Sequence, residues 1–221
     1  MNTLQDIFLT LTALSHVELM LGLLITGTVI VALEGWRLNL WALIAQSVLV
    51  GVLLARVIPA EVALIKIIVG GMVCLILYLT ARRAYGGTAM VTITANGHTP
   101  RAGTDVFSMD LWFRLVVALL AGVVSTALGD KHPFVDQPLG ISQACYWLVS
   151  IGLLTIVLSR DPFKVGLGLL TFQAGFGILL ATFEQSLSVA ALVGVVNLLT
   201  ALAIAYLTTA RTAFFVEDDI A

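Results

Sequence analysis

Charged residues are scarce in this chain of 221 amino acids: they make up 11% of it, whereas soluble domains carry about 25%. Hydrophobic residues make up 60%, and the mean hydropathy is +1.07. A soluble core of this length cannot absorb so much apolar surface, so the composition predicts an integral membrane protein, a single polytopic domain over residues 1–221. The formal net charge of −2 provides no basic surface, which argues against a nucleic-acid partner.

Cysteine is nearly absent, and the groups that usually carry catalysis form no pattern. Cys74 and Cys145 fall in apolar runs without metal-ligand spacing, so we expect small packing residues rather than a disulfide or a metal site. No catalytic triad, paired-carboxylate site, phosphate loop or metal cluster is recognisable. Lys164 begins the predicted sixth helix and the last helix has no lysine, which leaves a retinal Schiff base unsupported. We therefore expect no reaction chemistry and no cofactor in this chain.

Proline is missing from the interior of every long apolar run. All five prolines lie in predicted loops or at helix starts, and Pro162 is placed to open the first turn of the sixth helix. A membrane-spanning helix needs about 20 mostly apolar residues. The expected fold is therefore all-α, with about seven transmembrane helices over residues 13–33, 38–56, 62–81, 112–129, 138–159, 163–183 and 187–208.

The basic residues are distributed unevenly between the two sets of connections. With the N-terminus outside, the outer connections hold only Arg56 and Lys131. The inner connections and the C-terminal end hold eight: Arg37, Arg82, Arg83, Arg101, Arg114, Arg160, Lys164 and Arg211. Cytoplasmic loops carry an excess of Lys and Arg, so we expect an N-out, C-in orientation. The segment Met1–Asp6 lacks the basic region of a cleavable signal peptide, so we expect the first helix to be retained as an anchor.

One connection, residues 82–111, is much longer than the others and is predicted to be cytoplasmic. Alternation of apolar and polar residues before Asn96-Gly97, within Met90–His98, is typical of a small β-hairpin. The segment is either an ordered surface loop or a docking site for a peripheral subunit.

The chain contains a weak internal repeat. Tyr78–Ala84 and Tyr206–Ala213 end the third and seventh helices with similar sequences, as Gly51–Ala55 and Gly177–Ala181 do for the second and sixth. Helices 1–3 and 5–7 are thus candidates for parallel three-helix repeats joined by helix 4. Chance matching among Leu- and Ala-rich helices is the alternative.

Five polar side chains are predicted at or near membrane depth. A lysine at the centre of a membrane helix costs roughly 2.5–3.5 kcal/mol, so Lys66 must face protein, water or a partner charge. Gln46, Gln173 and Asn197 lie near the middles of helices 2, 6 and 7, and Glu18 lies near the outer end of helix 1. The amides serve either as separate contacts between helices or as a hydrated polar row that continues a proton path in a partner subunit. Glu18 is either interfacial or a partner for Lys66.

Short motifs in this chain resemble component E of the membrane-bound hydrogenase-4 and formate-hydrogenlyase group. The run from Glu34-Gly35-Trp36-Arg37-Leu38 through Ala45-Gln46-Ser47 is similar to that family's "Y-R-L" and "Q-S-L" elements, and Lys66 matches its helix-3 lysine. The section Leu148–Ala210, with Gly168–Gln173 and Val195-Val196-Asn197, is similar to the small K subunit of respiratory complex I. The resemblance covers most of the chain except residues 85–110.

The chain departs from that family at two positions. Helices 6 and 7 of the family each usually present an acidic residue, and these positions align with Gln173 and Asn197. An amide hydrogen-bonds water but neither releases nor stores a proton near neutral pH. Lys66 then remains as the group that can titrate within the membrane. Without the two acids, we do not expect the complete proton route of the family.

The resemblance implies a non-catalytic membrane subunit of a complex-I-like, redox-driven and ion-translocating assembly in a bacterial or archaeal cell membrane. Its partners would be antiporter-like membrane subunits and a peripheral redox or hydrogenase module, and redox cofactors would belong to these partners. Two alternatives stay open. One is a self-contained multi-pass transporter, in which the two three-helix repeats flank a midplane site lined by Lys66, Gln46, Gln173 and Asn197. The other is a purely structural scaffold subunit.

Overall fold

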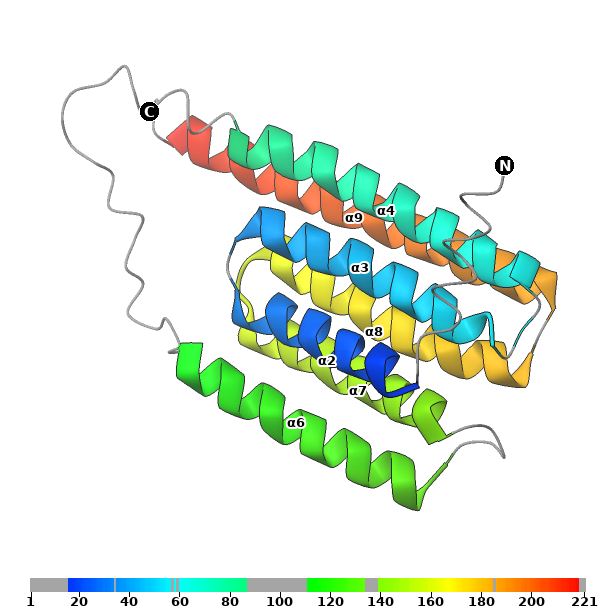
Figure 1. Ribbon diagram of the computed structural model, residues 1–221. Helices are drawn as coiled ribbons and strands as arrows, with labels where there is room; N and C mark the ends of the chain where they lie inside the picture. The colour runs from blue at the N-terminus through cyan, green and yellow to red at the C-terminus, as the bar shows by residue number, and fades with distance from the viewer. Residues whose placement is uncertain are drawn as a thin grey trace.

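The computed structural model describes residues 16–33, 35–56, 58, 60–86, 111–133, 139–184 and 186–218, and these residues form seven α-helices (Figure 1). Six are long and apolar enough to cross a membrane, and one is a shorter apolar helix. The all-α architecture predicted from composition and apolar length is confirmed. In chain order the helices are α2 (His16–Ala32), α3 (Trp36–Leu54), α4 (Ala60–Gly86), α6 (Leu111–Lys131), α7 (Leu139–Leu158), α8 (Pro162–Phe183) and α9 (Leu187–Asp218).

The helix ends follow the predicted spans closely, except where a helix continues past its apolar run. α8 begins at Pro162 as predicted, with Asp161 in an extended conformation before it. α4 runs to Gly86 instead of residue 81, and α9 runs to Asp218 instead of residue 208. A helix satisfies its own backbone hydrogen bonds and need not stop where the apolar residues do. The hairpin predicted within Met90–His98 lies outside the described residues.

The helices form two rows of three, with one helix outside them. α2, α3 and α4 make one row, and α7, α8 and α9 make the other (Figure 1). The rows pair in order, α2 with α7, α3 with α8 and α4 with α9, and the two helices of each pair run in the same direction. α6 packs mainly on α7. This is the arrangement expected of a parallel three-helix repeat with a connecting helix.

The most extensive helix contact, between α7 and α8, depends on glycine. A Cβ on Gly152 would lie 2.6 Å from the backbone nitrogen of Phe172, and a Cβ on Gly168 would lie 2.9 Å from the backbone oxygen of Gly152. Cys145 donates a hydrogen bond from Sγ to the carbonyl oxygen of Gly175 at 3.3 Å. Small residues allow membrane helices to approach this closely. Both cysteines are buried and free, as expected from the sequence.

Two apolar cores fill the space between the rows. The first lies mainly among α2, α3 and α7 and includes Trp147, whose Nε1 donates to the carbonyl oxygen of Leu23 at 2.9 Å. The second lies among α3, α4, α8 and α9 and includes Leu43, Leu77 and Phe163. Between this second core and one end of the same four helices the packing leaves a cavity.

Candidate functional site

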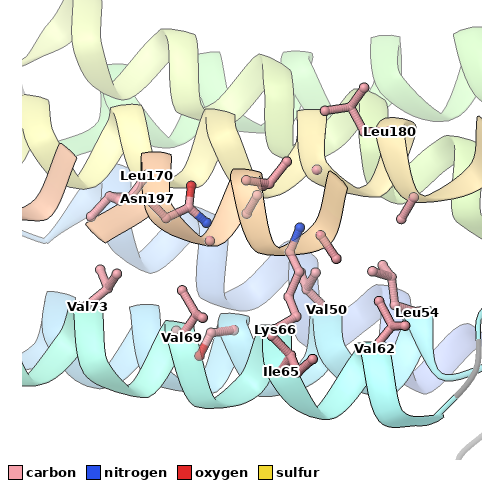
Figure 2. Close-up of a pocket in the computed structure, with 18 of the residues that line it drawn as sticks. Val50, Leu54, Val62, Ile65, Lys66, Val69, Val73, Leu170, Leu180 and Asn197 are labelled. Carbon is pink, nitrogen blue, oxygen red and sulfur yellow. The ribbon is translucent and has the colours of Figure 1, made fainter. Parts of the chain in front are cut away.

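The cavity lies between α3 and α4 of one row and α8 and α9 of the other, and its volume is about 90 Å³. Each helix turns one stripe of residues toward it, spaced three or four apart as on a single helix face. The walls are mostly apolar, and Figure 2 shows Lys66 pointing into the space from α4. The lining residues are Leu43, Gln46, Ser47, Val50, Leu54, Ile58, Val62, Ile65, Lys66, Val69, Gly70, Val73, Cys74, Leu170, Ala174, Gly177, Leu180, Ala181, Glu184, Val189, Ala190, Val193, Gly194 and Asn197.

Lys66 extends from α4 across the cavity to α8. A Cβ built on Gly177 would collide with Lys66 Nζ, so the ammonium group occupies the place that a side chain on α8 would otherwise take. Lys66 is partly buried, and no hydrogen bond or ion pair joins it to another residue in the described part of the chain. A charged group in this position needs water or a ligand to solvate it.

Two of the predicted amides share this cavity with Lys66. Gln46 is 1% exposed, and neither Nε2 nor Oε1 of its amide has a hydrogen-bond partner within the protein. Oδ1 of Asn197 is also buried without a partner, and its amide lies on the cavity side of α9 (Figure 2). Leaving a buried polar group unpaired costs about 1–3 kcal/mol. The cavity is large enough to hold several water molecules, because one needs roughly 10–15 Å³, and these groups would bind them.

The other two predicted polar residues lie elsewhere. Gln173 is not among the lining residues, and its Nε2 donates to Oγ1 of Thr200 on α9 at 2.9 Å. It therefore acts as a contact between helices, although its buried Oε1 has no partner within the protein. Glu18 is exposed on α2 and does not line the cavity, and α3 lies between α2 and α4 in the row (Figure 1).

No protein-family model, curated protein or solved structure matches this chain. The resemblance to hydrogenase-4 component E therefore stays a prediction from the short motifs around Gln46, Lys66 and Gln173.

The sequence did not predict the contacts of three residues that are important in the structure. Glu184 and Ser47 both line the cavity, and Lys164 is buried with Nζ donating to the carbonyl oxygens of Val31 and Leu33, each at 3.0 Å. Glu184 follows Gly177 by seven residues, so helical periodicity was a usable signal for it. Lys164 had no such signal, because only the packing of α8 against the end of α2 gives it a partner.

Proposed function

We propose that this chain is a non-catalytic membrane subunit of a complex-I-like or hydrogenase-like redox-driven assembly, in which it contributes a hydrated, Lys66-centred segment of a proton path. The observation that carries the proposal is the cavity itself. It brings Lys66, Gln46 and Asn197, which lie on three different helices, to one space that can hold several water molecules. A lysine paired only for packing would have a fixed acceptor, whereas this one faces a cavity with unpaired amides.

The family motifs support the same proposal. Gln46, Ser47 and Lys66, which belong to the motifs of the resemblance, line the cavity, and Asn197 takes the place of a family acid there. Lys66 can bind and release a proton, whereas the amides can only orient water. The assembly would lie in a bacterial or archaeal cell membrane, with antiporter-like subunits and a peripheral redox module as partners and redox cofactors held by them.

Substitution of Lys66 tests this function. Lys66→Met removes the titrating group and keeps much of the apolar stem, so we expect normal assembly but at least a tenfold loss of redox-driven proton movement. The measurements are co-purification of partner subunits from native membranes and acidification of inverted vesicles. Lys131→Met, at the exposed end of α6, is the matched control and should change neither. Loss of assembly alone would instead assign Lys66 a scaffold role.

A second candidate function, a self-contained transporter, is favoured by the enclosure of the cavity within one chain and between the two helix rows. Ligand sites of many transporters lie between such repeats near the midplane. This alternative predicts that a substrate raises the unfolding temperature of the isolated protein. Panels of ions, carboxylic acids and amines that produce no shift would count against it, and a stable lone monomer with its own transport activity would replace the first proposal.

A further inference from the structure

The cavity is closed at one end and reaches an exposed carboxylate at the other. Along α4 its lining extends from Val62 to Cys74, a rise of roughly 18 Å at 1.5 Å per residue. At the Cys74 end it meets buried residues of the second apolar core: Leu43, Val73, Cys74 and Leu170, each no more than 6% exposed. At the Val62 end lies Glu184, the one exposed residue of the lining. We call this one-ended space the vestibule.

α8 aligns Glu184 with Lys66. Residues 170, 174, 177 and 181 are spaced four, three and four apart, so they form one stripe on α8, and Glu184 follows three residues later as the extended C-cap residue. Gly177 in that stripe contacts the end of Lys66, and Glu184 follows it by seven residues, two turns or roughly 10 Å. The backbone N–H of Glu184 bonds to the carbonyl oxygen of Leu180 at 2.9 Å, which holds the residue at the helix end.

The charges of the vestibule select a class of ion. Its titratable lining groups are Glu184, Lys66 and Cys74, and no ion pair joins Glu184 to Lys66 in the described residues. A carboxylate at the mouth attracts cations, whereas an ammonium farther in repels metal ions such as Na⁺. A proton passes both groups, because it moves along water and binds each base in turn.

We propose that Glu184 is the mouth of a one-sided proton vestibule, through which Lys66 exchanges protons with the aqueous face at the connection between α8 and α9. A proton from that face binds the Glu184 carboxylate, passes along water to the neutral Lys66 amine and forms the ammonium ion. Lys66 then releases the proton into the path of a partner subunit or back to Glu184. This inference rests on the proposed function, and it makes the chain carry half of a path rather than a complete one.

Cysteine labelling of the full-length chain in native membrane vesicles tests the sidedness. The reporters are Ala181→Cys near the mouth and Ala174→Cys deeper in, each with Cys74 and Cys145 replaced by alanine. Ala201→Cys is the control, because Ala201 is fully buried and outside the lining. Charged, membrane-impermeant methanethiosulfonates should modify residue 181 faster than residue 174, both only from the face of the α8–α9 connection, and should not modify residue 201. Modification of either reporter from the opposite face, or of neither, overturns the vestibule.

The role of Glu184 is tested by comparing the labelling rates of a cationic and an anionic reagent. In the Ala181→Cys protein, Glu184→Gln should lower the ratio of cationic to anionic labelling rates about three- to fivefold at low ionic strength, and salt should shrink this effect. Asp130→Asn is the control, because Asp130 is exposed at the same end of the bundle but outside the vestibule. An unchanged ratio in Glu184→Gln, or an equal fall in both variants, overturns the assignment of Glu184.

These results separate the vestibule from the proposed function. Labelling as expected without co-purifying redox subunits supports the vestibule and contradicts the assembly. Co-purification of such subunits with unreactive cysteines at residues 174 and 181 supports the assembly and contradicts the vestibule.

Discussion

Glycines in this protein have different consequences according to what faces them. Gly177 faces the flexible end of Lys66, whereas Gly152 faces the backbone of α8 at Phe172. A side chain can rotate away from an added methyl group, but a helix backbone must move as a unit. The first position therefore controls where a charge lies, and the second controls how closely two helices pack.

Alanine substitutions at these two glycines should have different effects, one on the stability of the fold and the other on the position of Lys66. We expect Gly152→Ala to lower the free energy of unfolding by about 1–3 kcal/mol, because α7 and α8 must separate. Gly177→Ala should cost less than about 1 kcal/mol, because only the end of Lys66 moves. The measurement is the unfolding temperature of each variant in detergent, compared with that of the wild type. A greater loss in Gly177→Ala would show that the position of Lys66 is rigidly held.

At the scale of elements, the short helix α2 depends on its neighbours for its last turn. Its 17 residues end at Ala32, and the final carbonyl groups of a helix have no partner within it. Nζ of Lys164 on α8 donates to the carbonyl oxygen of Val31 in the last turn and to that of Leu33, the residue after the helix. Nδ2 of Asn39 on α3 also donates to the Leu33 oxygen, at 3.1 Å. A cation at a helix C-terminus also interacts favourably with the helix dipole.

Lys164→Met should destabilise this junction. Hydrogen bonds to a charged group are worth about 1.5–3 kcal/mol, and the substitution leaves the carbonyl oxygens of Val31 and Leu33 without that donor. We expect a lower unfolding temperature and faster proteolysis between α2 and α3, with partial rescue by Lys164→Arg. The exposed Lys131→Met should stay within about 0.5 kcal/mol of wild type. Equal stability of the two methionine variants would mean that Asn39 alone suffices.

At the scale of the whole molecule, basic residues are more numerous at one end of the bundle than at the other, because successive helices run in opposite directions. Near the helix ends, Arg37, Arg82, Arg83, Arg114, Arg160 and Lys164 lie toward one end of the bundle, and Arg56 and Lys131 lie toward the other, whereas Lys66 lies inside α4 (Figure 1). The positive-inside rule then predicts that the first end is cytoplasmic. It also predicts that the Glu184 end of the cavity faces outward.

The orientation is measurable with two exposed positions in a protein without native cysteines. Arg83→Cys and Lys131→Cys lie at the ends of α4 and α6, on opposite sides of the bundle. We expect an impermeant maleimide to label position 131 from outside intact cells and position 83 only after the membrane is opened. Labelling of both from one side would contradict the alternating spans, and the reverse pattern would invert the predicted orientation.

The seven helices, the start of α8 at Pro162 and the free cysteines followed from the sequence alone. The physical reason is that apolar length, the missing N–H of proline and the burial of a thiol act locally. The same reasoning placed Lys66, Gln46 and Asn197 at similar depth but did not show whether they meet. It also grouped Gln173 and Glu18 with them, and neither lines the cavity.

Which face of each helix meets its neighbours was decided only by the tertiary structure. Helices that are apolar on every side carry little amphipathic signal, so periodicity alone does not choose the inward stripe. Pairing of the rows and the glycine contacts of α7 with α8 set the rotation of each helix. That rotation turns Gln173 toward Thr200 and brings Glu184 and Lys66 to one cavity. Composition thus determined that the chain lies in a membrane, and packing determined which of its few polar groups lie together.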